Sequence, residues 1–244
     1  MLEGMYAAAA GMYAQQARLD SLSNDIANVN TTGYKPVRQG FHDLLYSEGG
    51  LATKGTQLGT GAEVSDMGRS QIQGALQQTG EPLDIAISGT GYFQVQEQDG
   101  SKSLTRDGHL QVDKLGRLST DTGQLLDPKI VVPKGDDASK ISIAPTGDVT
   151  SNGKKIGTIK ILDVVAPDKL RPVGNTSFQV TAESGPAAQV KSGSTIVQNA
   201  VEASATDLGD TMTNMIESQR AYELASRAIT TQDKVAETAI GVKR

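Results

Sequence analysis

The chain has 244 residues, 4% aromatic side chains, no Cys, no Trp and a formal net charge of -5 at pH 7. The acidic balance argues against nucleic-acid binding, because contacts with phosphate groups need a basic surface. The absence of Cys excludes disulfides, thiol catalysis and Cys-ligated zinc sites. No apolar run approaches the roughly 18 residues of a membrane-spanning helix, so we expect no direct membrane insertion.

Residues 1 to about 30 are predicted to form a helix, since they are rich in Ala and Gln and contain no Pro. Two columns with a seven-residue spacing give this helix an imperfect coiled-coil seam. The columns are formed by Met5, Met12, Leu19 and Ile26, and by Ala8, Gln15, Leu22 and Val29. The helix is expected to stop at residues 30–33, where Gly33 can supply left-handed backbone.

The first residues also bear on export. They carry Glu3 and have no Lys or Arg before Arg18. A Sec signal begins with positive charge and continues as an unbroken apolar segment. We therefore expect no Sec signal, so that passage out of the cytoplasm requires another export route.

The middle of the chain, residues 83–180, is predicted to be a compact and mostly antiparallel β domain. Short apolar segments alternate there with hairpin signals at Asp99-Gly100, Asp107-Gly108 and Asn152-Gly153. We expect this domain to fold alone. Residues 36–82 and 181–200 are rich in Gly, Ser, Gln and Thr with few apolar anchors, so they are expected to be extended connectors.

The C-terminal part is predicted to be helical from about Val201 to Glu237, with Ser204 or Thr206 as the N-cap. Its seven-residue column consists of Val201, Leu208, Met215, Tyr222, Ile229 and Ala236. Because both ends share this period, we predict an α+β fold in which the N- and C-terminal helices form a coiled-coil-like pair. The domain division is then residues 1–35 with 201–244 as a helical assembly domain, 36–82 with 181–200 as connectors, and 83–180 as the β domain.

Each predicted helix has a narrow apolar stripe, and two such helices alone bury little surface. Ordering a residue costs about 1–2 kcal/mol in conformational entropy, so a lone pair of helices is marginal. One interpretation is a helical hairpin packed on its own β domain. The other is that many copies pack their terminal helices together, since a repeated contact that does not close produces a helical filament.

The segment SNDIANVNTTGYK, residues 23–35, resembles the N-terminal motif of the flagellar basal-body rod and hook proteins, the axial proteins of the flagellum. The motif positions are filled by Ser23, Asn24, Ile26, Ala27, Asn28, Thr31, Gly33, Tyr34 and Lys35. Further matches follow in order at FHDLLY (41–46), QLGTG (57–61), SGTGYFQV (88–95), LTRDGHLQVD (104–113) and NMIESQRAYE (214–223). The resemblance therefore covers nearly the whole chain.

This resemblance implies a structural subunit that polymerises helically into the hollow rod, the drive shaft that transmits torque from motor to hook. The implied partners are further copies of the chain, other rod proteins, the hook protein, ring proteins around the rod and the flagellar type III export apparatus. The implied location is the periplasmic rod of the basal body. A distal position in the rod is expected, with a proximal rod subunit as the alternative, and Ser47–Thr56 is shorter than in distal members.

We expect no catalytic, cofactor-binding or metal site. Asp107 and His109 are close in sequence but have no partner motif of an enzyme, and a secreted β-rich adhesin would leave both helical ends without a role. Asn24 and Asn28 share one helix face and are predicted to form hydrogen bonds between subunits, with simple solvation as the alternative. The predicted assembly interface is Met5, Met12, Leu19, Leu22, Asn24, Ile26, Asn28, Val29, Leu208, Met215, Tyr222 and Ile229, with Gly33 as the helix stop.

Overall fold

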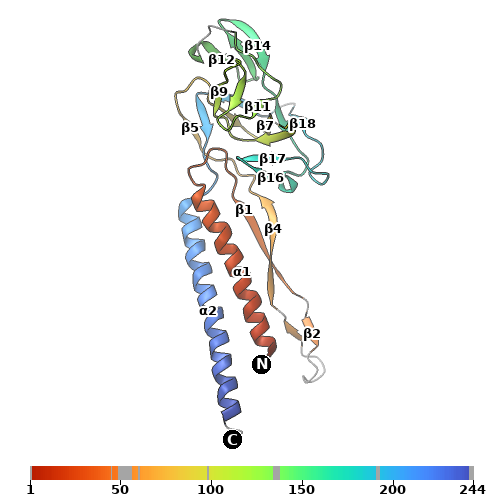
Figure 1. The fold of residues 1–244 in the computed structure, drawn as a ribbon, viewed down its shortest axis with the longest axis vertical. Helices are drawn as coiled ribbons and strands as arrows, with labels where there is room; N and C mark the ends of the chain where they lie inside the picture. Colours follow the sequence, from red (N-terminus) through yellow and green to blue (C-terminus); the bar gives the residue numbers. More distant parts are fainter. Residues whose placement is uncertain are drawn as a thin grey trace. The chain divides into compact units, whose positions relative to one another are not determined.

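The computed structural model describes residues 2–44, 46–48, 57–59, 61–97, 99–133, 138–190 and 193–241. It confirms the α+β prediction: α1 (Leu2–Ala27) and α2 (Leu208–Gly241) pack together, and the strands lie between them in the sequence (Figure 1). The chain divides into two compact units. We call residues 1–27, 37–67 and 207–244 the helical unit, and residues 28–36 and 68–206 the β unit.

In the helical unit the two helices run in opposite directions (Figure 1). The guanidinium of Arg18 donates a hydrogen bond to Asn214 Oδ1 at 3.0 Å and ties α1 to the first half of α2. The N-cap of α2 is Asp207, whose Oδ1 accepts a hydrogen bond from the backbone N–H of Asp210 at 3.1 Å. The predicted caps Ser204 and Thr206 are therefore wrong, because the helix starts later than its seven-residue pattern indicates.

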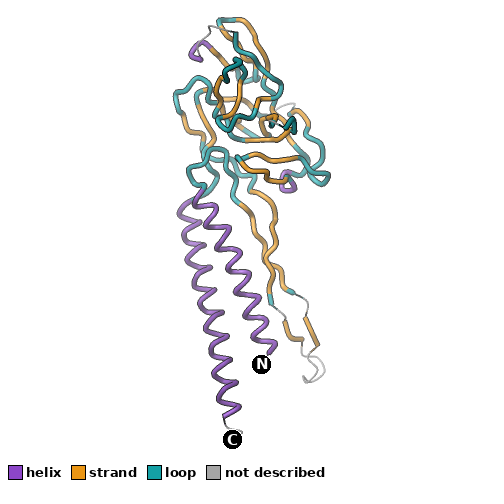
Figure 2. Tube along the Cα trace, in the orientation of Figure 1, coloured by secondary structure: helices purple, strands orange, loops and turns teal. Residues whose placement is uncertain are grey.

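A long ribbon of β1 (Val37–Asp43) and β4 (Ala62–Arg69) lies beside α1 (Figure 2). The short strands β2 (Tyr46–Glu48) and β3 (Gln57–Gly59) pair with each other. The side-chain amide of Gln39 donates a hydrogen bond to the carbonyl of Ala17 at 3.3 Å, which links the ribbon to α1. Of the short segment Ser47–Thr56, residues 49–56 lie outside the described residues.

The β unit holds the remaining strands. These are β5 (Leu76–Gln78), β6 (Ile85–Ser88), β7 (Tyr92–Gln96), β8 (Lys102–Thr105), β9 (Leu110–Val112), β10 (Leu118–Thr120), β11 (Leu125–Leu126), β12 (Ile141–Ile143), β13 (Asp148–Ser151), β14 (Lys154–Thr158), β15 (Ile161–Asp163), β16 (Arg171–Gly174), β17 (Ser177–Gln179), β18 (Ala188–Gln189), β19 (Thr195–Gln198) and β20 (Ala200–Glu202), with two 3₁₀ turns at Ala138–Lys140 and Pro167–Lys169.

The largest sheet follows the order β16-β17-β8-β7-β11-β10-β9, with β15 joining β7 to β18. Smaller sheets are formed by β12-β13-β14, β19-β6 and β20-β5. The pairings within the β unit are antiparallel, as predicted. The sequence expectation of a mostly antiparallel domain is thus confirmed. The division into assembly domain, connectors and β domain, and the independent folding of residues 83–180, stay predictions.

Two of the three predicted hairpins are present. Gly100 turns between the paired strands β7 and β8, and Asn152-Gly153 turns between β13 and β14, with positive φ at all three residues. The Asp107-Gly108 hairpin is wrong, because β8 and β9 pair with other strands. Gly108 instead lies so close to Ile85 that an added Cβ would be 1.6 Å from the Ile85 carbonyl oxygen. The absence of a side chain at Gly108 therefore allows the two chain segments to cross in contact.

The main core gathers aliphatic side chains from several of these sheets. It comprises Leu83, Ile85, Ile87, Phe93, Val95, Leu110, Leu118, Leu126, Ile130, Val132, Ile141, Ile143, Val149, Ile159 and Ile196. A second cluster contains Tyr92, Leu104, Leu162, Val164, Leu170 and Phe178. Ile196 belongs to β19, which pairs with β6 opposite Ile87, so part of the stretch 181–200 contributes to the core.

Replacing Ile196 by Ala tests this contribution. We expect Ile196→Ala to lower the free energy of unfolding by about 2–5 kcal/mol, since the substitution leaves a cavity in the main core. The control Val165→Ala removes an exposed side chain and should change stability by no more than about 0.5 kcal/mol. Urea unfolding followed by circular dichroism measures both, and equal stabilities for the two variants would mean that β19 is a connector rather than a core strand.

Candidate functional site

The predicted interface residues fall in both units. Those on α1 and α2 lie on the packed helices, whereas Asn28 and Val29 follow the end of α1 at Ala27 and belong to the β unit. Nine of them are half-buried in the single chain: Met5, Met12, Leu19, Leu22, Ile26, Asn28, Val29, Met215 and Ile229. The other three, Asn24, Leu208 and Tyr222, are exposed.

The side of α2 that faces α1 carries small and polar residues. An added Cβ on Gly4 of α1 would be 2.7 Å from Nε2 of Gln232, so Gln232 contacts α1 directly. Ser218 and Thr211 precede Gln232 by fourteen and twenty-one residues and therefore lie in the same column, and both are buried. Sequence reasoning chose a different column of α2, three residues earlier, because it followed large apolar residues.

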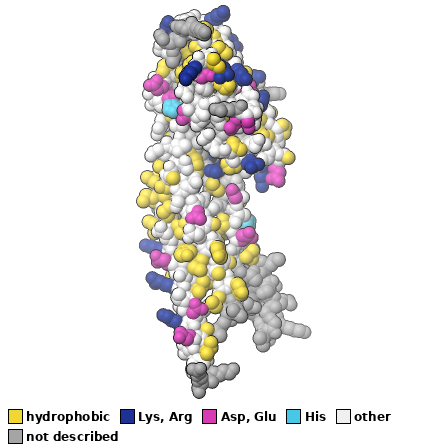
Figure 3. Space-filling view, in the orientation of Figure 1, with side chains coloured by type: hydrophobic (Ala, Val, Ile, Leu, Met, Phe, Trp, Pro, Cys, Tyr) yellow, Lys and Arg dark blue, Asp and Glu magenta, His cyan; other side chains and the backbone are white. Residues whose placement is uncertain are grey.

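Several large apolar side chains on the helices remain in solvent. Leu208, Met212 and Ile216 are 44%, 51% and 50% exposed and follow each other at four-residue spacing on α2. Tyr6 and Tyr13 of α1 are 71% and 80% exposed. Hydrophobic side chains gather over the helices in the space-filling view (Figure 3). Such contiguous apolar surface is typical of a site of protein association.

Leu208, Met212 and Ile216 on α2 are called the apolar row from here on. Sequence analysis gave Leu208 as an interface residue but did not include Met212 and Ile216 in the interface. The signal that could have found them is the four-residue spacing itself, which places successive side chains on one face of a helix. These side chains stay exposed although α1 and α2 pack together, so their burial requires a partner outside the chain.

The motif segment that follows α1 is anchored in the β unit by buried charges. Nζ of Lys35 donates hydrogen bonds to Glu202 Oε1 at 2.5 Å and to the carbonyl of Ile72 at 2.6 Å. Nη1 of Arg106 donates to Glu202 Oε2 at 3.0 Å. The side chains of Lys35 and Glu202 are 2% and 0% exposed. Burial lowers the pKa of Lys35, and the nearby Glu202 carboxylate opposes that change.

Gly33 lies within the same segment. Its φ is +67°, and its backbone N–H donates a hydrogen bond to the carbonyl of Glu202 at 2.8 Å. An added Cβ would be 2.6 Å from the backbone nitrogen of Asp107, so space and backbone conformation both favour glycine. Since α1 ends at Ala27, Gly33 lies six residues beyond the helix, in a turn against β20.

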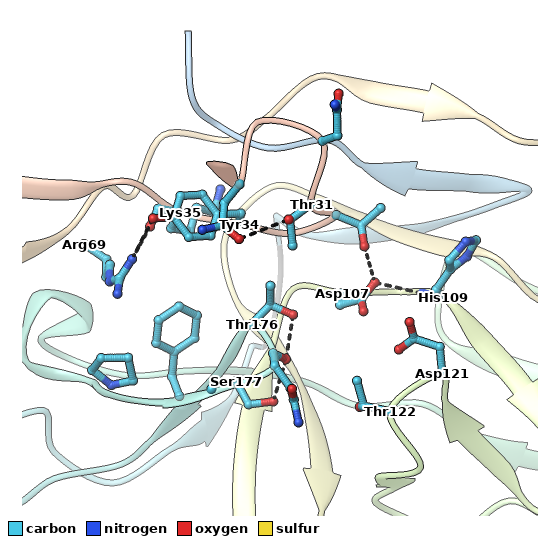
Figure 4. A pocket seen from close by; sticks show the side chains of 17 residues that line it. Thr31, Tyr34, Lys35, Arg69, Asp107, His109, Asp121, Thr122, Thr176 and Ser177 are labelled. Atoms are coloured by element: carbon cyan, nitrogen blue, oxygen red, sulfur yellow. Dashed lines mark hydrogen bonds between the residues drawn. The ribbon is translucent and has the colours of Figure 1, made fainter. Parts of the chain in front are cut away.

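A polar groove of about 660 Å³ opens beside this segment. Asp107, His109 and Asp121 lie together at one end, while Tyr34 and Arg69 lie toward the other (Figure 4). Asp107 Oδ1 accepts hydrogen bonds from Thr32 Oγ1 at 2.8 Å and from the backbone of His109 at 3.2 Å. The groove therefore joins the motif segment to the turn before β9.

The pKa values of Asp107 and His109 in this region are shifted. Burial raises the pKa of Asp107, although its hydrogen bonds from Thr32 and His109 oppose the shift. Partial burial lowers the pKa of His109, but the hydrogen bond and charge of Asp84, with Asp107 and Asp121 nearby, outweigh it and raise the pKa. In the part of the chain that the structure describes, the His109 ring has one hydrogen-bond partner, Asp84 at 2.5 Å.

The described residues contain no group of three or more His, Cys, Asp or Glu side chains that could hold a metal ion. None of the helices within the described ranges is long and apolar enough to cross a membrane.

The two asparagines of the motif already have interactions within the chain. Thr31 Oγ1 donates a hydrogen bond to Asn28 Oδ1 at 3.1 Å in the turn after α1. Asn24 lies on α1 and also interacts with residues of its own chain. Because α1 ends between them, the two side chains are not on one continuous helix face. Their predicted hydrogen bonds between subunits stay a prediction.

Three family models match the chain. "Flagella basal body rod protein" matches residues 5–35, "Flagellar hook protein FlgE/F/G D1 domain" residues 86–151, and "Flagellar basal body rod FlgEFG protein C-terminal" residues 197–242. The matches therefore include α1 with the motif segment, the centre of the β unit and α2.

Curated relatives agree with these matches over the whole chain. The flagellar basal-body rod protein FlgG of Agrobacterium fabrum is 36% identical over 250 residues, which cover 94% of this chain and 95% of that protein. FlgG of Borreliella burgdorferi is 33% identical over 264 residues, which cover 100% of both chains. The flagellar hook-basal body complex protein FlhP of Bacillus subtilis is 30% identical over 264 residues, covering 96% of this chain and 97% of that protein.

The buried charge cluster predicts a large effect of removing its anion. We expect Glu202→Gln to lower the free energy of unfolding by about 3–5 kcal/mol, because two buried cations lose their counter-charge. The matched control is Asp148→Asn, which weakens the exposed pair of Asp148 with Lys155 and should change stability far less, because solvent screens exposed ion pairs. Urea unfolding of both variants provides the comparison, and a Glu202→Gln loss as small as the control's would contradict the role of the cluster.

The raised pKa of His109 predicts a pH dependence. Because its folded-state pKa lies above the unfolded value of about 6.5, His109 stabilises the fold fully below that pH. The stabilisation is lost as the pH rises through the folded-state pKa. Unfolding at pH 5.5 and 8.5 should therefore show that His109→Gln destabilises the chain more at the lower pH. An equal loss at both values would show that the pair with Asp84 does not depend on the imidazolium.

Proposed function

The chain belongs to the flagellar basal-body rod protein family, and from this premise we propose that its copies polymerise helically through α1 and α2 into the hollow rod. It is a structural protein of the flagellar basal body, where it assembles with other flagellar proteins. The rod then transmits torque from the motor to the hook. The exposed apolar row of Leu208, Met212 and Ile216 is the single observation that supports assembly through the helices most directly.

The physical argument rests on what the helices bury and expose. The α2 side of their seam includes the small and polar side chains of Thr211 and Ser218, while the large apolar groups of the apolar row lie in solvent. Full burial of one such side chain against a neighbour is worth about 1.5–3 kcal/mol. Repeating the contact along a non-closing polymer places every copy except the last in that favourable state. The predicted interface residues on α1 and α2 are proposed to take part in these contacts.

We further propose a position for the chain along the rod and a set of partners. Relatives named FlgG, the distal rod protein, favour a distal position over the proximal alternative. Export by the flagellar type III apparatus without a Sec signal would bring the chain to the periplasmic rod. There its proposed partners are other copies, other rod proteins, the hook protein and surrounding ring proteins. The segments 1–35 and 201–244 are proposed as the assembly part and residues 83–180 as the outward-facing domain.

We assign the chain no catalytic activity. The family is structural. Asp107 and His109, which were considered as catalytic candidates, form hydrogen bonds that stabilise the fold. Asp107 joins the motif segment to the β unit through Thr32, and His109 pairs with Asp84. A secreted adhesin is also not favoured, because relatives match across both helical ends.

A charge placed in the helix contact tests the proposed assembly. Leu19 and Met215 are half-buried on the two helices. We expect Leu19→Asp and Met215→Asp to abolish rods and motility, since an unpaired buried carboxylate costs several kcal/mol in every copy. Electron microscopy of basal bodies carrying the labelled subunit measures incorporation and locates the chain along the rod.

Two controls accompany this experiment. The thermal unfolding of the β unit should be unchanged, and the amount of exported protein must match the unsubstituted chain. Met215→Asp lies far from the N-terminus, so it separates an assembly defect from an export defect. Normal rods and swimming with both variants would contradict assembly through the helices.

A further inference from the structure

Besides the apolar row, the helical unit contains an apolar groove of about 360 Å³. One wall is α1 and the other is the ribbon that lies beside it. The groove is lined by Ala10, Tyr13, Ala14, Ala17, Leu44, Ala62, Glu63 and Val64. The α1 wall includes alanines at three- and four-residue spacing, whose small side chains leave room for a bulky side chain from outside.

The row and the groove match in length. At about 1.5 Å per residue, the row from Leu208 to Ile216 spans about 12 Å. The alanines from Ala10 to Ala17 span about 10.5 Å by the same rise. Three large side chains at four-residue spacing therefore correspond to three small ones along nearly the same distance, which is the arrangement in which knobs enter holes.

The charges at the ends of these surfaces are complementary. Arg220 follows Ile216 by one helical turn and continues the line of the row, and it is exposed. Glu63 lies on the groove wall and is also exposed. Within the described residues neither side chain has an ion pair. Arg18, the nearby cation on α1, is already bound to Asn214 and lies over the Phe41 ring.

The row cannot reach the groove of its own chain. Gln232, Ser218 and Thr211 mark the side of α2 that faces α1, and Met212 lies about 100° around the helix from Thr211. The groove lies between α1 and the ribbon, away from the α1–α2 seam. Two different and complementary surfaces on one chain define a heterologous contact, which generates a filament when it does not close.

We propose that the apolar row of one copy docks into the groove of a second copy, with Arg220 of the first beside Glu63 of the second. This inference rests on the proposed function and specifies which surfaces meet.

The direction of docking is internally consistent. An added Cβ on Gly61 would be 2.8 Å from the Ala10 side chain, so β4, which carries Glu63, starts at the Ala10 end of the groove. An α2 docked antiparallel to α1 places Leu208 near Ala17, Ile216 near Ala10 and Arg220 at the end where β4 starts. Copies with a common orientation in a rod require this direction, because α1 and α2 are antiparallel in each copy.

Cysteine pairing tests the contact cleanly, because the chain has no Cys of its own. Cells would express Ile216→Cys and Ala10→Cys copies together, and purified basal bodies would be oxidised and analysed for disulfide-linked dimers. We expect dimers in this mixture. Two matched mixtures should give at least tenfold less: Glu217→Cys with Ala10→Cys, because Glu217 lies about 100° around α2 from Ile216, and Ile216→Cys with Ala17→Cys, which tests the register.

A charge exchange tests the same contact without cysteines. Arg220→Glu and Glu63→Arg should each reduce the number of rods and the swimming of cells, and the two substitutions together should restore both. Basal bodies that contain the chain but show no preferred cross-link and no rescue would overturn the docking while leaving the proposed function intact. Basal bodies from cells with the unsubstituted protein that lack the chain would overturn both.

Discussion

The carboxylate of Glu202 is fully buried, so its charge has to be compensated by groups that are buried with it. Lys35 and Arg106 supply two cations, and the backbone N–H of Gly74 donates a further hydrogen bond at 2.9 Å. Three segments far apart in sequence therefore meet at one side chain of β20. The motif segment after α1 is held in the β unit by this requirement, and the conformation of Gly33 and the bonds of Asp107 depend on where that segment lies.

Sequence analysis succeeded where local pattern determines structure. The seven-residue columns predicted both helices and their pairing, and the Asn152-Gly153 signal predicted a hairpin whose residues have the positive φ that such turns need. It failed where distant residues decide. Gly108 accommodates the carbonyl of Ile85, and Ile196 fills the core from a stretch that is mostly polar. Lys35 and Glu202 are 167 residues apart, and no local pattern indicates that they pair.

The seam between the two helices is a second case in which spacing along the sequence does not decide the structure. Large apolar residues at heptad spacing were taken as the helix seam, and the structure adds the buried Thr211 and Ser218, which lie three residues after Leu208 and Met215 on the neighbouring column. Small residues let two helices approach closely, so they gain contacts that a column of larger side chains would prevent. Other apolar groups lie beside this seam, where Leu208 and Met212 are about half exposed. Spacing alone predicts that a helix has an apolar face. Whether that face packs against the other helix or stays exposed depends on the side chains of that helix.

A subunit of this kind has to remain separate before assembly and associate firmly afterwards. Gly209, Asp210 and Thr213 are exposed on the adjoining faces of α2, so small and polar groups that favour solvent lie beside the apolar row. Docking at the groove would bury only a few side chains, each worth about 1.5–3 kcal/mol, against the loss of translational freedom on binding. One such contact is therefore weak. A copy at the end of a growing rod contacts several neighbours at once, so these modest contacts add and favour elongation over association in solution.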